Sequence, residues 1–342
     1  MNAKPDVRHP AVSVIMPVLD EERHLRGAVQ AILAQEYAGD MEVVIALGPS
    51  SDRTDEIAAE LVAEDPRVVT VPNPTGRTPA ALNAAIKASR HPVVVRVDGH
   101  GILSPDYITT AVRLLEETGA MNVGGIMHAE GENDWEHAVA AAMTSRIGVG
   151  NAAFHTGGEA APADTVYLGV FRREALEQQG GYNEEFIRAQ DWELNFRIRE
   201  AGGLIWFSPE LKVSYRPRPS VRALAKQYKD YGRWRHVVAR YHEGSINLRY
   251  LAPPAAVCAI AAGVVAGVAL TPWAFVIPGG YLAAIALGSV PAGKGLPAKA
   301  RLQIPVALAT MHMSWGFGFL TSPKALARKV IASRRPAVLE PR

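Results

Sequence analysis

The sequence predicts an α/β fold: a mainly parallel sheet with helices on both faces, followed by an amphipathic helix and then by transmembrane helices. Three observations predict it. Short β-branched runs alternate with helical patterns over the first hundred residues, a basic, aromatic-rich helical pattern starts at Val221, and positions 250–293 contain no Asp, Glu, Lys or Arg. Such alternation is typical of parallel sheets, and an uncharged run of this length can cross a membrane twice.

The elements of the first part follow this alternation in order. Strands are expected at 12–16, 42–47, 68–71 and 93–97, with helices at 25–35, 54–64 and 79–89 between them. Further strands are expected at 165–171, 204–207 and 213–215, and a helix at 192–201. Ligands bind beyond the carboxyl ends of parallel strands, so the residues that follow each strand are the first candidates for a site.

The charge pattern divides the chain into four parts. We expect a catalytic domain at 1–215, a basic interface region at 216–249, two to three transmembrane segments within 250–323 (about 251–271, 273–291 and 302–321), and a basic tail at 324–342. A buried helical hairpin is the alternative for the first two apolar segments, although a soluble hairpin would normally show a polar face.

The third apolar segment raises a conflict over topology. Cytoplasmic loops carry an excess of Lys and Arg, and both the loop with Lys294, Lys299 and Arg301 and the basic tail suit the cytoplasm. Three full crossings would place the tail outside. The segment is therefore either a third crossing that breaks the rule or a re-entrant or interfacial helix.

The basic region at 216–249 predicts an amphipathic helix. Its apolar residues recur every three or four positions from Val221 to Tyr241, and nine basic residues face only Asp230 and Glu243. A helix of this kind beside a membrane segment suits the interfacial plane. Packing against the catalytic domain is the alternative, and both can hold at once.

Several classes of protein are disfavoured. The start of the chain lacks the apolar stretch of a secretory signal, so the N-terminal part is expected in the cytoplasm. The single cysteine, Cys258, excludes a disulfide framework and a cysteine-based zinc site. No G-x-G-x-x-G follows the first strand, so a dinucleotide site has no support. No nucleic-acid partner is expected, and the sequence identifies no protein partner.

Three segments could carry chemistry or bind a ligand. Asp98 and His100 follow a buried strand, and one carboxylate with one imidazole can hold a divalent ion that also binds diphosphate oxygens; an Asp-Gly turn is the alternative. Asp191 opens a helix, where an acid can cap the helix or act as a general base. In the segment 164–173, Gly169 in a strand can mark close approach by a ligand, and the Arg172–Arg173 pair can simply be solvated.

In chain order these segments resemble the motifs of the inverting family 2 glycosyltransferases, which have the GT-A fold. Residues 14–22 look like the family's opening strand and loop, and 50–54 resemble its S-T-D-G-T turn. Residues 98–100 stand in the place of its D-x-D motif, and 190–193 in the place of its E-D-x-E segment. The most similar branch is that of the succinoglycan-type exopolysaccharide glucosyltransferases, which share further elements at 96–100, 164–169 and 227–235.

The resemblance implies a role for each motif residue. Asp191 would be the catalytic base, and Asp98 and His100 would bind a Mg²⁺ or Mn²⁺ ion. The donor nucleotide would contact Pro17, Val18, Glu21, Ser50, Asp52, Asn83, Arg96 and Asp98. The acceptor or diphosphate would contact Asp164, Gly169, Arg172, Gln190, Glu193, Gln227, Arg233 and Trp234.

The resemblance also implies the reaction. A hexose, with glucose as the first candidate, would pass with inversion from a nucleotide sugar to a lipid-linked saccharide at the inner face of a bacterial cytoplasmic membrane. Asp191 must be ionised for this, so burial is not expected to raise its pKa far. Leu47-Gly48 replaces the acid that the family commonly has there, which leaves the nucleotide open, and Gln227 and Arg233 lie too far apart for the processive Q-x-x-R-W motif.

Two other functions compete with this one. A sugar nucleotidyltransferase would need a glycine-rich phosphate loop near the N-terminus, and residues 17–22 contain no glycine. A membrane scaffold that binds a nucleotide sugar without turnover would keep the same motifs, so only an activity measurement separates it from an enzyme.

Overall fold

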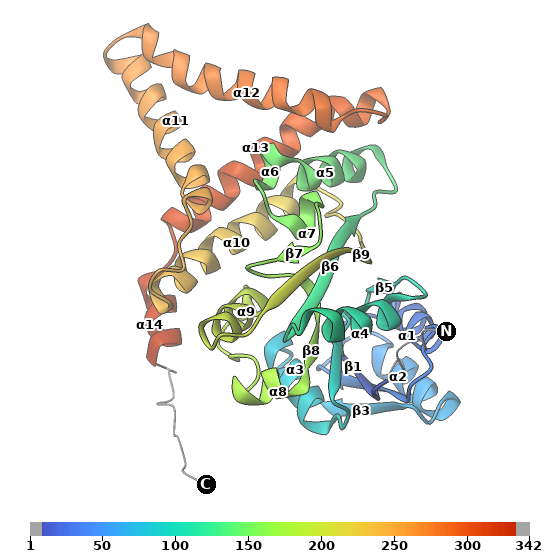
Figure 1. Ribbon diagram of the computed structural model, residues 1–342. Helices are drawn as coiled ribbons and strands as arrows, with labels where there is room; N and C mark the ends of the chain where they lie inside the picture. The colour runs from blue at the N-terminus through green and yellow to red at the C-terminus, as the bar shows by residue number, and fades with distance from the viewer. Residues whose placement is uncertain (1–8, 333–342) are drawn as a thin grey trace, which may run out of the picture. The chain divides into compact units, whose positions relative to one another are not determined.

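The computed structural model describes residues 9–332, which form two compact units (Figure 1). The first unit contains the described residues up to His128 together with Gly157–Tyr215. The second contains Ala129–Thr156 and the described residues from Arg216 onwards. The segment at 129–156, which the sequence pattern assigned to the catalytic part, thus belongs to the second unit.

The first unit begins with four parallel strands. They are β1 (Val12–Val18), β2 (Met41–Leu47), β3 (Val68–Pro72) and β4 (Val93–Arg96), in the order β3-β2-β1-β4. All four were predicted within two residues at each end. The residues of β1, β2 and β4 are largely buried, with Val14, Ile45 and Val95 inaccessible to solvent, as expected for parallel strands covered on two sides. β3 lies at the edge of the sheet and is mostly exposed.

The rest of the sheet is antiparallel, so the sheet as a whole is mixed. It continues through β8 (Tyr167–Arg172), β6 (Asn122–Ala129), β9 (Ile205–Tyr215) and β5 (Ile102–Leu103), with β7 (Ala161–Pro162) also paired to β9. The expected parallel sheet is therefore correct for the first four strands only. β9 is one strand where the pattern predicted two. It can contain Pro209 because its pairs with β7 and with β5 lie on either side of this proline, which takes part in neither pair.

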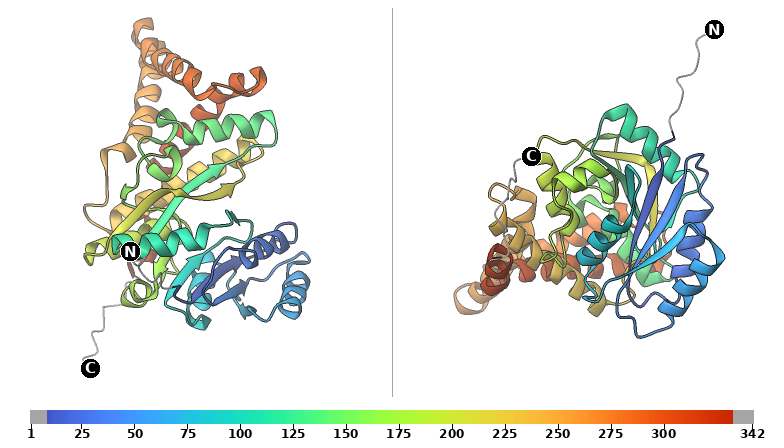
Figure 2. Two further views of the ribbon diagram at one scale, coloured as in Figure 1. Left: turned by 45° about the vertical axis from the view of Figure 1, so that its right-hand side comes forward. Right: turned by 90° about the horizontal axis from the view of Figure 1, so that it is seen from below.

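Helices cover both faces of this sheet (Figure 2). They are α1 (Leu25–Leu33), α2 (Thr54–Glu64), α3 (Thr78–Ala88), α4 (Tyr107–Thr118), α8 (Arg173–Gln178) and α9 (Gln190–Glu200). In α4 the buried positions include Ile108, Val112 and Leu115, which recur at helical spacing. Full burial of each such side chain contributes about 1.5–3 kcal/mol, so one face of α4 fixes it to the sheet. The helix ends at Gly119, whose φ of 68° suits a left-handed C-cap.

The second unit is helical. It comprises α5 (Asp134–Thr144), α6 (Arg146–Val149), α7 (Ala153–Thr156), α10 (Val221–Tyr241), α11 (Ala252–Ala269), α12 (Val276–Ala292), α13 (Ala298–Leu320) and α14 (Lys324–Ala332), with short 3-10 turns η1 (Leu248–Tyr250) and η2 (Pro272–Phe275). α10 is the predicted amphipathic helix. It crosses α13 in backbone contact: a Cβ on Gly232 would lie 1.9 Å from the Trp315 carbonyl oxygen, and one on Gly318 would lie 2.0 Å from that of Lys229.

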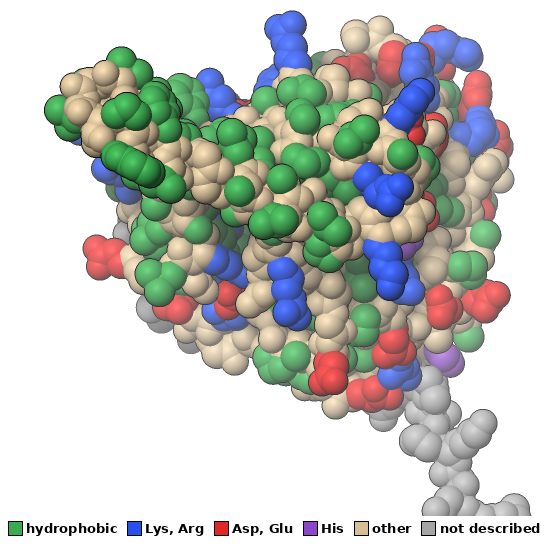
Figure 3. Space-filling model, turned by 90° about the horizontal axis from the view of Figure 1, so that it is seen from above, with side chains coloured by type: hydrophobic (Ala, Val, Ile, Leu, Met, Phe, Trp, Pro, Cys, Tyr) green, Lys and Arg blue, Asp and Glu red, His purple; other side chains and the backbone are tan. Residues whose placement is uncertain are grey.

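Two segments of the second unit are long and apolar enough to cross a membrane, Leu248–Ala269 and Pro272–Ala292. Hydrophobic side chains lie along this hairpin (Figure 3), and large ones such as Leu270 and Trp273 are 82% and 86% exposed. A soluble core hairpin would bury them, so this alternative is disfavoured. The third predicted segment forms α13, which packs on α10 and α11 and is not among the candidate spans of residues 9–332. The predicted tail beyond Ala332 lies outside the described residues.

Candidate active site

The loops that follow β1 and β2 are joined by side-chain hydrogen bonds. The backbone N–H of Asp20 donates to Ser50 Oγ (3.1 Å), that of Glu21 to Thr54 Oγ1 (2.7 Å), and that of Glu22 to Asp52 Oδ2 (3.1 Å). The predicted donor-binding residues Ser50 and Asp52 therefore hold the loop that contains Glu21. The hydroxyl of Thr54 leads the interactions that lower the pKa of Asp52, so this carboxylate stays ionised as a hydrogen-bond acceptor.

Arg96 connects the two loops expected to carry the chemistry. It is the last residue of β4 and is only 3% exposed. Its Nε and Nη2 donate to Asp98 Oδ1 at 3.1 and 3.0 Å, and its Nη1 donates to Asp191 Oδ1. Asp98 and Asp191, 93 positions apart, thus share one guanidinium group at the carboxyl edge of the sheet.

Three influences set the pKa of Asp191. Desolvation raises the pKa of Asp191 above its ordinary value, the charge of Arg96 lowers it, and the nearby Asp98 carboxylate raises it again, so the net direction is upward. About a third of the side chain, 35%, remains exposed. Asp191 also lies in the first turn of α9, where the helix dipole favours the carboxylate. Arg96 is therefore the principal side chain that opposes protonation of Asp191.

His100 lies on the same loop as Asp98 and pairs with Glu21 from the loop after β1. The distance from His100 Nδ1 to Glu21 Oε1 is 2.7 Å. Residue 99, between Asp98 and His100 in the chain, needs to be a glycine, because a Cβ there would lie 2.9 Å from the Glu21 Cγ. The sequence analysis assigned Glu21 to nucleotide binding and His100 to metal binding. In the structure these two side chains are in contact.

The residues at this loop suit a cation that is shared with a substrate. Among residues 9–332 no group of three His, Cys, Asp or Glu side chains is arranged to hold a metal ion. Mg²⁺ typically takes only one or two protein carboxylates and completes its shell with water and substrate phosphates. Both hydrogen bonds from Arg96 go to Asp98 Oδ1, which leaves Oδ2 as a suitable ligand beside the half-exposed His100.

Tyr182 is a site residue that the motifs did not indicate. It precedes α9, is 3% exposed, and its ring lies 6.0 Å from the guanidinium carbon of Arg96. Burial, followed by the Asp191 charge, raises the pKa of its hydroxyl, so the phenol is neutral. The only signal in the sequence was its position after Gly180-Gly181, two residues that turn the chain with φ values of 65° and 75°.

Three of the predicted acceptor residues have structural partners instead. A Cβ on Gly169 would lie 2.3 Å from Asn122 Oδ1, so this glycine makes room for a neighbouring side chain. Arg172 donates to the carbonyl oxygens of Leu115 (2.7 Å) and Ala120 (3.1 Å) at the end of α4. Glu193 is fully buried and pairs with Arg197 at 2.8 Å.

The remaining predicted residues lie as follows. Pro17 and Val18 end β1, the buried Gln190 begins α9, and Asp164 pairs with Arg199 at 3.4 Å. Gln227, Arg233 and Trp234 belong to α10 in the second unit. There Gln227 Nε2 donates to the Tyr231 hydroxyl (2.9 Å), Arg233 lies 3.9 Å from Asp230, and Trp234 is buried. The structure therefore brings together Glu21, Arg96, Asp98, His100 and Asp191.

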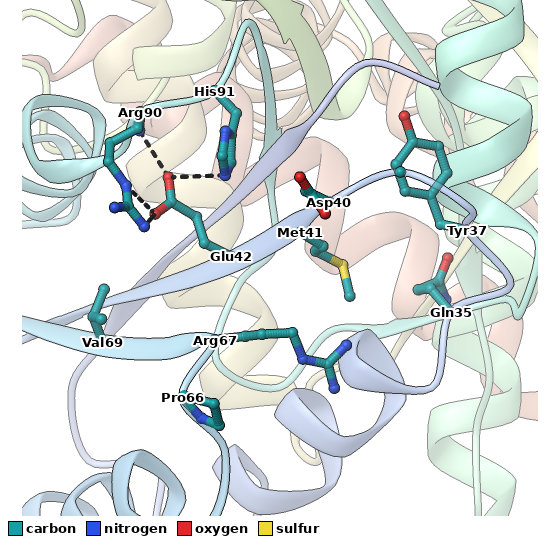
Figure 4. Close-up of a pocket in the computed structure, with 11 residues that line it drawn as sticks. Gln35, Tyr37, Asp40, Met41, Glu42, Pro66, Arg67, Val69, Arg90 and His91 are labelled. Atoms are coloured by element: carbon teal, nitrogen blue, oxygen red, sulfur yellow. Dashed lines mark hydrogen bonds and ion pairs between the residues drawn. The ribbon is translucent and has the colours of Figure 1, made fainter. Parts of the chain in front are cut away.

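A surface cavity of about 530 Å³ lies at the opposite edge of the sheet, at the amino ends of β2 and β3 (Figure 4). Arg90 and His91 flank the buried Glu42 at one end of it, and Arg67 and Tyr37 line the rest. Glu42 also accepts from Ser13 Oγ and from the Arg90 backbone N–H, each at 2.7 Å. These contacts hold the edges of β1 and β2 together, away from Asp98 and Asp191.

Comparison with solved structures supports the fold. The chain is similar to the mannosyltransferase PcManGT from Pyrobaculum calidifontis, solved in complex with GDP-Man and Mn²⁺, with a TM-score of 0.57, 18% identity, and coverage of 96% of this chain and 89% of the other. It is also similar to S. aureus TarS 1-349 in complex with UDP-GlcNAc, with a TM-score of 0.52, 14% identity, and coverage of 91% and 90%. At these identities the likeness shows the fold, which is the expected GT-A fold.

Comparison of sequences identifies the family. Residues 13–180 match the model for glycosyl transferase family 2. The chain is 33% identical over 309 residues to the succinoglycan biosynthesis protein ExoA of Rhizobium meliloti, covering 90% of this chain and 93% of that protein. A Methanococcus voltae dolichyl N-acetyl-α-D-glucosaminyl phosphate 3-β-D-2,3-diacetamido-2,3-dideoxy-β-D-glucuronosyltransferase is 25% identical, with coverage of 71% and 77%. The chain belongs to glycosyltransferase family 2.

Proposed function

We propose that this glycosyltransferase moves a hexose, with inversion, from a nucleotide sugar to a lipid-linked saccharide during the synthesis of a bacterial cell-surface or exported polysaccharide. Glucose from UDP-glucose is the first candidate donor. The catalytic unit faces the cytoplasm, and the apolar hairpin anchors it in the inner membrane. Each acceptor receives a single sugar.

One observation supports this proposal above the others: the buried Arg96 joins Asp98, at the place of the family's metal motif, to Asp191, at the place of its catalytic acid. An acceptor hydroxyl that donates its proton to Asp191 can attack the anomeric carbon from the side opposite the diphosphate. Displacement of this kind inverts the anomeric configuration. The positive charge of Arg96 favours the ionised base that this step needs.

The donor-binding residues are chosen by their place at the carboxyl edge of the sheet. Glu21, Asp98 and the loop held by Ser50 and Asp52 lie there together, as ligand-binding loops of α/β sheets do. Asp98 and His100 would hold a divalent cation, which would offset the charge of the leaving diphosphate. The relatives do not agree on a nucleotide, since one solved structure contains GDP-Man and another UDP-GlcNAc.

The membrane and the acceptor are inferred from the second unit. Two adjacent segments can cross a bilayer, and a basic stretch with Lys294, Lys299 and Arg301 follows them. Basic loops favour the cytoplasmic side, so the hairpin would return the chain to the side of the catalytic unit. A saccharide built on a lipid carrier would then be presented at the same membrane surface. ExoA, which is similar over 90% of this chain, is a succinoglycan biosynthesis protein, which fits such an acceptor.

A screen of nucleotide sugars tests the proposal. Purified full-length protein in detergent is mixed with UDP-, GDP- and dTDP-sugars, Mn²⁺ or Mg²⁺, and a bacterial lipid extract, and release of nucleoside diphosphate is followed. We expect release with one donor, dependent on the extract and abolished by EDTA, with label transferred to the lipid phase. Binding of a nucleotide sugar without release or transfer would instead identify a scaffold, and activity in excess EDTA would remove the cation from the proposal.

A further inference from the structure

We infer that Asn83 is a positioning residue. Through Tyr182 it fixes Arg96 between Asp98 and Asp191, and it does not contact the nucleotide. This inference rests on the proposed transferase function, because it concerns how the base of that reaction is held. It assigns a role to a side chain on α3 that the family pattern placed in the donor site.

Asn83 binds both backbone groups of Tyr182, although 99 residues separate them. Its Nδ2 donates to the Tyr182 carbonyl oxygen at 2.8 Å, and its Oδ1 accepts from the Tyr182 N–H at 2.8 Å. The same Nδ2 donates to Glu184 Oε1 at 3.0 Å. A primary amide has two N–H donors, and both are used in these contacts. Asn83 therefore has no hydrogen left to donate to a nucleotide.

The backbone at this point admits the amide because residue 181 is glycine. Gly181 has a φ of 75°, which an L side chain rarely adopts, and a Cβ there would lie 2.5 Å from Asn83 Oδ1. Arg197 Nη2 donates to the Gly181 carbonyl oxygen at 2.8 Å and is itself paired with the buried Glu193. The turn before Tyr182 is thus fixed from two sides.

Tyr182 transmits this placement to the site. Its buried ring lies 6.0 Å from the guanidinium carbon of Arg96, a distance at which an aromatic face attracts a cation. Arg96 in turn contacts Asp98 and Asp191. If the Tyr182 backbone relaxes, the ring loses its place beneath Arg96, and Asp191 loses its fixed partner. Small misplacements of this kind can cost on the order of a hundredfold in rate.

A double-mutant cycle tests the inference. Asn83→Ala, Tyr182→Ala and the double variant are assayed for kcat, for KM of the active nucleotide sugar, and for binding of free UDP, or of GDP if the active donor carries GDP. We expect Asn83→Ala to lower kcat by roughly tenfold or more and to leave nucleoside diphosphate affinity within about twofold. In the Tyr182→Ala background the same change should have little further effect, because two residues that act in series are not additive.

Two further variants keep the test decisive. Asn83→Asp keeps the shape and the acceptor oxygen but lacks the two N–H donors, so it should show the same loss of kcat if Asn83→Ala fails to fold. Asn133→Ala removes a different asparagine, whose Oδ1 caps α5 by accepting from the Glu136 N–H at 3.0 Å; it should lower the unfolding temperature without lowering kcat.

Three outcomes are distinguishable. Weaker nucleoside diphosphate binding in Asn83→Asp, or independent and additive losses in the cycle, would overturn the positioning role alone. If the wild-type protein turns over and both Asn83 variants keep the wild-type kcat, the positioning role is overturned as well. An absence of wild-type turnover with every nucleotide sugar would instead overturn the proposed function, and with it this inference.

Discussion

Arg96 and Asp191 form an ion pair although 95 residues separate them in the chain. The arginine ends a parallel strand, the aspartate begins a helix, and burial of the guanidinium leaves it few other partners. Because Asp98 shares the same guanidinium, this pair fixes the distance between the predicted cation loop and the predicted base. The family assignment gives the reaction class, and the proposed mechanism takes its geometry from this pair.

Replacing Arg96 by methionine should move the pH dependence of activity. Arg96 opposes the desolvation and the Asp98 charge that raise the pKa of Asp191, so its loss should raise that pKa further. The base works when ionised, and the acid limb of the kcat/KM profile should therefore shift to higher pH, with a large loss of kcat at neutral pH. Profiles of wild type and Arg96→Met with the active donor measure this. An unshifted limb would separate Arg96 from the ionisation of the base.

Asp98→Asn should weaken the use of the cation. A neutral amide is a poorer ligand for Mg²⁺ or Mn²⁺ than a carboxylate, so the Mn²⁺ concentration that gives half-maximal release of nucleoside diphosphate should rise by roughly tenfold or more. Mn²⁺ binding followed by electron paramagnetic resonance should show the same change. Asp65→Asn is the matched control, because Asp65 pairs with Arg67 at the other edge of the sheet. Equal Mn²⁺ requirements in wild type and Asp98→Asn would assign the cation elsewhere.

The strands and helices of the first hundred residues could be predicted because each carries its own local pattern. The helix at Thr54–Glu64 shows the helical spacing of its buried residues, and β1, β2 and β4 are the apolar runs of strands covered on both faces. The antiparallel half could not be predicted in the same way, since pairing of β8 with β4 and β6 joins distant segments. Strand polarity and order are set by these distant contacts.

The sequence could indicate residues in loops that follow strands, but not the contacts that those side chains make with distant segments. Asp98 and Asp191 were chosen from their loops, and the structure brings them to one arginine. Gly169 and Arg172 looked like ligand-binding residues, but Asn122 fills the space beside the first, and the carbonyl oxygens at the end of α4 bind the second. No local pattern could reveal those partners. For the same reason the contact between Asn83 and Tyr182 was visible only in the structure.

Glu42 should make stability depend on acidic pH. Burial alone would raise its pKa, but hydrogen bonds from Ser13 and Arg90 and the charge of His91 outweigh burial, and the pKa is lowered. A carboxylate with a lowered folded pKa contributes stability above its unfolded pKa, about 4.3, and this contribution is lost as pH falls through the folded value. Unfolding temperatures measured from pH 7 to pH 3 should fall less steeply in Glu42→Gln than in wild type. Parallel curves would refute this role.

Two buried tyrosines should respond oppositely to loss of their hydroxyls. Among the described residues the buried hydroxyl of Tyr182 has no hydrogen bond of normal geometry, only the neighbouring guanidinium of Arg96, whereas that of Tyr107 donates to the Leu168 carbonyl oxygen at 3.1 Å. Tyr107→Phe should lower the free energy of unfolding by about 1 kcal/mol, and Tyr182→Phe should leave it unchanged or raise it. Unfolding temperatures in one detergent compare the two variants directly. If Tyr182→Phe destabilises the protein more than Tyr107→Phe does, the Tyr182 hydroxyl is hydrogen-bonded in the folded protein and the prediction is wrong.

Asp191→Asn tests the central claim most directly, because it removes the proposed base and keeps the shape of the side chain. Donor affinity and single-turnover transfer to the lipid acceptor are measured on the same preparation, with Asp65→Asn beside it. We expect donor affinity to stay within about threefold while transfer falls by roughly 10²–10⁴-fold. Transfer at the wild-type rate would contradict the assignment of Asp191 as the base that Arg96 holds in place.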